Sequence, residues 1–134
     1  MRHFAKQMHQ IGDMRVSRVI EQLMPPFSPT FLFPDRDASL LEKHWPWMIP
    51  EHYNEAEAKI VISIHTWVVR TKRHAILIGS CAGNHKHRPL FPQFDQRNLP
   101  FLDRLQDGGV TPEAVDYVLC THLHLDRVGQ NILL

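Results

Sequence analysis

The clearest hydrophobic pattern in the chain predicts a β-hairpin near its middle. Residues 59–70 read KIVISIHTWVVR, and this density of β-branched side chains favours a strand. A polar turn over residues 71–73 separates it from a second apolar run, residues 74–78, so the two runs are expected to pair. Residues 11–23 alternate loosely and predict a further strand. Residues 116–120, whose apolar part reads YVLC, predict a buried strand.

Three helical segments are predicted between these strands. Residues 37–44 form a short helix with an aspartate as its N-cap, and the prolines at positions 46 and 50 then break it. In residues 99–106 leucine recurs at every third position, a proline suits the first turn, and two glycines end the helix. Residues 111–113 open a short helical turn.

Two other segments are predicted to be loops. Residues 24–34 hold four prolines and three phenylalanines, so neither a helix nor a central strand is expected there. Residues 79–92 show little periodicity, and long loops inside compact domains often carry function. The order of strand, loop, helix, two strands, helix and strand predicts a mixed α/β (α+β) fold.

The composition fits one globular domain over residues 1–134, with 43% apolar and 22% charged residues. The net charge of +1 gives no electrostatic case for binding nucleic acid or an anionic membrane. No apolar run approaches the ~20 residues of a membrane helix, and no apolar segment follows the basic N-terminus as in a secretion signal. We therefore expect a cytoplasmic protein in which Cys81 and Cys120 are buried thiols.

The candidate chemistry lies in residues 121–127, THLHLDR, directly after the last predicted strand. Histidines at i and i+2 of an extended segment point to the same side, so His122 and His124 can bind one ion. The two leucines that alternate with them then face the core. Asp126 lies at the next same-side position, where its carboxylate can bind a second ion or accept a proton from a metal-bound water. The motif predicts a metal-dependent hydrolase with Asp126 as its catalytic residue.

Three further side chains are candidates for a substrate pocket. Trp45 and Trp47 either cover the edge of a core or form the wall of a pocket. His85 and His87 alternate among basic residues, which indicates a solvated loop or, alternatively, a contact with substrate. The pocket hypothesis therefore names Trp45, Trp47 and His85.

The segment CTHLHLDRVG, residues 120–129, resembles the metal-binding signature THxHxDHxG of the metallo-β-lactamase superfamily. The resemblance covers nearly the whole chain from about Gly12 onward. It is to a subgroup of metallo-hydrolases near the enzymes that open N-acyl homoserine lactones. The other segments that carry it are LFPD (32–35), SIHTWVVRT (63–71), CAGNHKHRP (81–89), PFLDRL (100–105) and TPEAVDYVLCTHLH (111–124).

This resemblance implies a fold, a metal and a reaction. The fold would be the N-terminal half of an αββα sandwich of two similar halves, with the metals at the edge between them. His122 and His124 would hold the first of up to two zinc ions, and Asp126 the second. A bridging hydroxide would attack the carbonyl of a small-molecule ester, lactone or similar substrate, or sometimes a phosphorus centre.

Three features depart from the family pattern. Arg127 stands where the family has the histidine of the second metal, and an arginine stays protonated and cannot ligate. Gly79-Ser80 stands where the family typically has Asp-Thr, and that aspartate supports the metal loop. The sequence ends at Leu134, before the family's third histidine, bridging aspartate and last histidine.

These departures leave two function hypotheses. In the first, the chain is a fragment of a zinc-dependent hydrolase, inactive alone, with an exposed apolar face that favours self-association. In the second, it is a degenerate, non-catalytic binding or scaffold module of the same fold. A third reading, in which the histidines are structural in an ordinary α/β domain, is disfavoured by the length of the resemblance.

Overall fold

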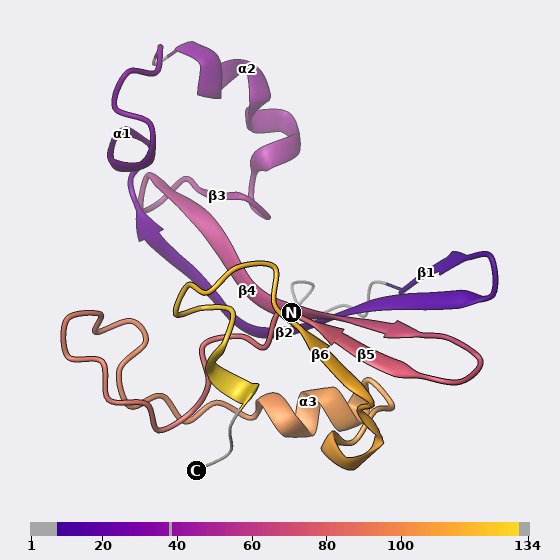
Figure 1. Ribbon diagram of the computed structural model, residues 1–134. Coiled ribbons are helices and arrows are strands. Elements are labelled where there is room, and N and C mark those ends of the chain that lie inside the picture. The colour runs from indigo at the N-terminus through magenta and orange to yellow at the C-terminus, as the bar shows by residue number, and fades with distance from the viewer. Residues whose placement is uncertain (1–7, 38, 132–134) are drawn as a thin grey trace. The chain divides into compact units, whose positions relative to one another are not determined.

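The computed structural model describes residues 8–37 and 39–131 (Figure 1). At residues 25 and 26 it describes the backbone but not the side chains. Its strands are β1 (Met8–Ile11), β2 (Met14–Phe27), β3 (Tyr53–Asn54), β4 (Lys59–Arg70), β5 (Ala75–Ile78) and β6 (Tyr117–Leu119). Its helices are α1 (Pro29–Leu32), α2 (Ser39–Met48), α3 (Phe101–Asp107) and the 3₁₀ turns η1 (Pro112–Ala114) and η2 (Gly129–Asn131). The strands form a sheet in the order β1-β2-β4-β5-β6, with β3 paired to β4. This mixed α and β content agrees with the predicted fold class.

The chain divides into two compact units, and the first contains the segments up to Gln22 and from Ile64 onward. In this unit β4 and β5 form the predicted antiparallel hairpin, and β6 adds to β5 in parallel. The helix α3 forms where its leucine spacing predicts, and it buries Phe101 and Leu105 to 1% exposure. The Arg104 guanidinium of α3 donates to the carbonyl oxygens of Ile20 and Glu21, at 3.1 and 2.6 Å, and so ties α3 to β2.

The second unit contains residues 23–63. Here α2 runs through Pro46 to Met48, so the prediction that Pro46 breaks this helix was wrong. A proline inside a helix removes one backbone donor, and the next turn still closes because Ile49 N–H donates to the Trp45 carbonyl at 3.0 Å. The helix begins at Ser39, whose N–H donates to the Asp37 carboxylate at 2.9 Å. This hydrogen bond lowers the pKa of Asp37.

The N-terminal strand also differs from its prediction. A turn with Gly12 at φ +57° divides the predicted strand, so β1 and β2 form a hairpin in place of one strand over residues 11–23. The strand β2 then continues to Phe27, into the segment predicted as a loop, and α1 follows. Prolines are tolerated on a strand where one side has no hydrogen-bonded neighbour. The strand β1 pairs with residues 14–17 of β2, at the other end of that strand.

The strand β6 forms where it is predicted, but it is not buried. Tyr117, Val118 and Leu119 are 53%, 41% and 52% exposed, because β6 is the edge strand of the sheet. An apolar strand at an open sheet edge is a site for further pairing or packing. Within the described residues, no helix is long and apolar enough to cross a membrane.

Candidate metal centre

His122, His124 and Asp126 lie together in the loop between β6 and η2. One ligand atom from each of the three lies within 4.8 Å of the other two, and the two imidazole centroids are 4.7 Å apart, at 85° to each other. The convergence was predicted, but its cause was not. The segment is a series of bends and turns instead of an extended strand, and Leu123 is 83% exposed instead of facing the core.

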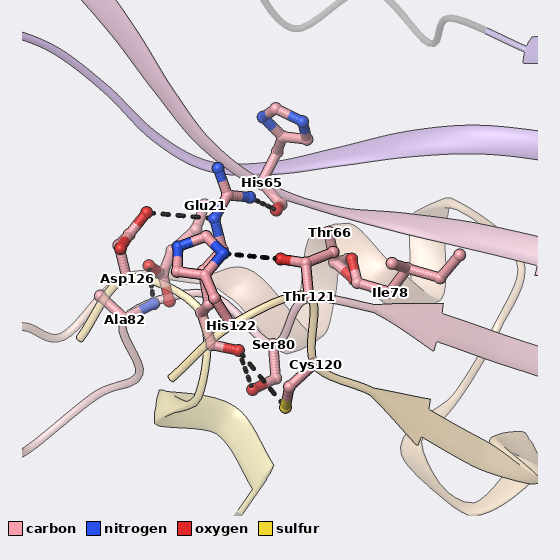
Figure 2. Close-up of polar contacts among 11 residues, drawn as sticks. Glu21, His65, Thr66, Ile78, Ser80, Ala82, Cys120, Thr121, His122 and Asp126 are labelled. Atoms are coloured by element: carbon pink, nitrogen blue, oxygen red, sulfur yellow. Dashed lines mark hydrogen bonds and ion pairs between the residues drawn. The ribbon is translucent and has the colours of Figure 1, made fainter. Parts of the chain in front are cut away.

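Residues 79–83, which follow β5, are hydrogen-bonded to the end of this loop. Ser80 donates its backbone N–H and its hydroxyl to the Arg127 carbonyl, at 2.8 and 3.0 Å (Figure 2). In the other direction, Gly129 N–H donates to the Cys81 carbonyl at 2.8 Å, and Gln130 N–H to the Ser80 carbonyl at 2.9 Å. We call residues 79–83 and 127–130 the loop pair. These backbone hydrogen bonds hold the metal-ligand loop against residues 79–83.

Two glycines let the loop pair approach this closely. A Cβ on Gly129 would lie 1.7 Å from the Ala82 carbonyl oxygen, and one on Gly83 would lie 2.5 Å from the backbone of Gly129. Neither backbone could give way without breaking the hydrogen bonds just described. The glycine of the motif, Gly129, is therefore explained by backbone packing.

A buried carboxylate, Glu21 of β2, supports the loop pair. It is 2% exposed and accepts hydrogen bonds from the N–H groups of Ala82 and Gly83, at 2.9 and 3.0 Å, and from the Gln130 side chain at 3.1 Å. Figure 2 shows Glu21 beside Ala82 behind the metal-ligand loop. Sequence reasoning missed this residue, although an acidic residue in the apolar run VIEQL was a usable signal.

Arg127 does not point away from the site. Its Nε lies 3.1 Å from the Asp126 carboxylate, and its Nη1 donates to the His65 carbonyl at 3.3 Å; dashed lines at Asp126 and His65 in Figure 2 mark these contacts. The two side chains are 24% and 23% exposed, so solvent screens the pair only in part. The Nε contact lacks hydrogen-bond geometry and is therefore an ion pair at close range.

The donor set fits a divalent metal. Two imidazoles and a carboxylate are the ligand types of catalytic zinc sites, which use three protein ligands. Tetrahedral ligands at ~2.1 Å from zinc are about 3.4 Å from one another, so the present group needs to close by only about 1.4 Å. The Thr121 hydroxyl lies 2.9 Å from His122 Nδ1. A hydrogen bond to one ring nitrogen orients the imidazole and leaves Nε2 to the metal.

The other candidate residues are not among the three residues that converge. Trp45 and Trp47 belong to the second unit, where Trp45 stacks on Tyr53 with ring centroids 6.3 Å apart and Trp47 donates to His44 Nδ1 at 3.1 Å. His85 is exposed in the loop that follows β5, with φ +54° and its N–H bound to the Arg97 carbonyl at 2.8 Å. Their assignment to a substrate pocket stays a prediction.

The two cysteines differ from each other. Cys81 is fully buried, and this burial raises the pKa of its thiol far above the ordinary value, with a further contribution from Glu21. Cys120 is exposed next to the metal-ligand loop, so the prediction that both thiols are buried was wrong for Cys120. The difference follows from position, because Cys120 comes directly after the exposed edge strand.

A family model described as the metallo-beta-lactamase superfamily matches residues 60–134. No curated protein matches the chain.

Solved structures that share its fold include three hydrolases. AbOPH, a hydrolase of the beta-lactamase superfamily, is 26% identical, with a TM-score of 0.67, over 92% of this chain and 38% of its own. A probable metal-dependent hydrolase from Staphylococcus aureus is 21% identical, with a TM-score of 0.68, over 91% and 42%. AidC, a dizinc quorum-quenching lactonase, is 17% identical, with a TM-score of 0.67, over 93% and 38%. The chain thus spans about two fifths of the length of these structures.

Proposed function

The chain belongs to the metallo-beta-lactamase superfamily, and from this premise we propose that it is part of a metal-dependent hydrolase. The observation that carries the proposal is the convergence of His122, His124 and Asp126 within 4.8 Å. Superfamily membership supports metal dependence, and the hydrolases among its structural neighbours support the reaction class. Because the chain matches only part of those structures, activity is a property that we assign to the whole hydrolase, with the isolated chain inactive.

Zinc is the metal that we propose, because imidazole is a favoured ligand of this borderline divalent ion. When bound, zinc would polarise the carbonyl under attack and make a hydroxide nucleophile available near neutral pH. The residues of the chain have separate tasks. His122 and His124 bind the ion, and the Thr121 hydroxyl orients the His122 ring at 2.9 Å. The Asp126 carboxylate lies in the same group and can accept a proton from the attacking water.

For the substrate we propose a small molecule with an ester, lactone or similar carbonyl bond. A likeness to AidC, a quorum-quenching lactonase, supports this choice at the level of the fold. The same scaffold can host several hydrolytic reactions, so the substrate has to be decided at the site itself.

A second candidate function is a non-catalytic module of the same fold. The observation that favours it is the ion pair between Arg127 and Asp126, which occupies the proposed catalytic carboxylate at 3.1 Å. The two candidate functions differ in the zinc content that they predict, because a non-catalytic module does not need to retain zinc.

Metal analysis of the purified chain tests the proposal. After incubation with zinc and desalting, we expect bound zinc in the chain and its loss in His122→Ala and His124→Ala. His9→Ala, in the exposed strand β1, is the matched control and should retain the metal. Equal zinc content in the chain and in His122→Ala would contradict the proposed metal site.

A further inference from the structure

We propose that the Arg127 guanidinium takes the place of a second metal ion, so that this centre binds one ion, through His122 and His124. The inference rests on the proposed metal site and goes beyond it, because it assigns a number of ions and a task for Arg127. It also changes the reading of the sequence, in which Arg127 was treated as a lost ligand.

The first argument is the position of the charge. Asp126 would be a ligand of the second ion in a two-metal site, and here the Arg127 Nε lies 3.1 Å from its carboxylate. The Asp126 charge is therefore already neutralised by a fixed cation that belongs to the chain. A second dication at the same carboxylate would have to share it with this guanidinium, and the two positive charges would repel each other.

The second argument is that the guanidinium is held in place on its other side. Arg127 Nη1 donates to the His65 carbonyl of β4 at 3.3 Å, which fixes the side chain between two elements. The backbone of Arg127 is fixed as well, because its carbonyl accepts both hydrogen bonds from Ser80. The charge is thus positioned by the fold and does not move freely in solvent.

The third argument concerns Gly79, the other departure from the family signature. The atoms nearest to a Cβ at this position would be Arg127 Cδ and Nη1, at 3.5 and 3.7 Å. These are van der Waals contact distances, so a side chain at this position would lie against Arg127, and the backbone at φ +73° independently favours glycine. Gly79 and Arg127 fit each other, so the two departures form one arrangement instead of two independent losses.

Zinc stoichiometry provides the first test. We expect one equivalent of zinc in the chain and a second one in the Gly79→Asp/Arg127→His double variant. That variant places an imidazole beside Asp126 at the second-metal position, and at position 79 the aspartate that the family signature has in support of the metal loop. Arg73→His, in an exposed turn, is the control and should leave one equivalent. Two equivalents in the unmodified chain, or no second equivalent in the double variant, would overturn the inference.

A double-mutant cycle provides a second test that needs no metal. Unfolding of the chain, Arg127→Met, Asp126→Asn and the combined variant is measured in the presence of a chelator. We expect a coupling of about tenfold in the unfolding equilibrium constant, as for other residues in direct contact. Additive effects would refute the ion pair and with it the inference. If no variant binds zinc but the coupling is present, the proposed metal site fails while the role of Arg127 as the partner of Asp126 stands.

Discussion

Replacing Glu21 should destabilise the fold and weaken metal binding without touching a metal ligand. The carboxylate is 2% exposed and accepts three hydrogen bonds, two of them from the buried backbone N–H groups of Ala82 and Gly83. In Glu21→Gln, the amide oxygen can replace the Oε1 atom that accepts from Gly83 and Gln130. The new NH₂ group then faces the N–H of Ala82, which is left without an acceptor.

The size of the effect follows from this unsatisfied donor. A buried polar group that loses its partner costs about 1–3 kcal/mol, so Glu21→Gln should lower the free energy of unfolding by that amount. Glu21→Ala leaves all three donors unpaired and opens a cavity, which should cost roughly 3–6 kcal/mol. Since domains are stable by only about 5–15 kcal/mol, the alanine variant can fail to fold, and the glutamine variant is the informative one.

The assay is urea unfolding followed by circular dichroism, together with a zinc titration. The exposed Glu51→Gln is the control and should change the free energy of unfolding by no more than about 0.5 kcal/mol. Zinc affinity in Glu21→Gln should fall by about 10–100-fold, as for other residues that support metal ligands. A stability equal to that of the control variant would refute the assignment of Glu21 as the support of the loop pair.

Three further predictions concern the surface and the termini of elements. The exposed apolar strand β6 should cause self-association, which sedimentation should show for the chain and which Val118→Lys should reduce; a monomeric chain with a sharp melting transition contradicts this. Iodoacetamide should modify Cys120 in the folded chain but Cys81 only after unfolding, because burial raises the Cys81 pKa; mass spectrometry of digests distinguishes the two thiols. The Asp37 pKa is lowered in the fold, so its stabilisation is present above the unfolded pKa of about 3.9 and is lost as the pH falls through the folded value. Asp37→Ala should therefore lower the urea midpoint at pH 6 and leave it unchanged at pH 2, and a pH-independent difference would argue against this role.

Features with a local cause could be predicted from the sequence. The β-branched run of residues 59–70 and the leucine spacing of α3 are set by neighbours along the chain, and both elements form where they are expected. The extent of α2 beyond Pro46 and the exposure of β6 could not be predicted in this way. They depend on which other segments lie beside them.

The candidate site shows the same division. The motif of His122, His124 and Asp126 predicted that the three residues converge, although they do so on bends and turns and not on the expected extended segment. The residues that hold them in place come from far along the chain, since Glu21 is on β2 and Ser80 follows β5. The hydrogen bonds of Glu21 and Ser80 are tertiary contacts, and the periodicity of the sequence does not predict them.

The loop pair has a consequence for the proposed zinc site. Its hydrogen bonds join residues about fifty positions apart, so the ligand geometry arises only when the distant segments have closed on each other. A peptide of the ligand loop alone has no such template, so zinc binding at the proposed site would be thermodynamically linked to folding. Free zinc at a hundred times its dissociation constant would add about 2.7 kcal/mol to the stability of the folded state. Zinc availability in the cell would then determine how much of the folded protein persists.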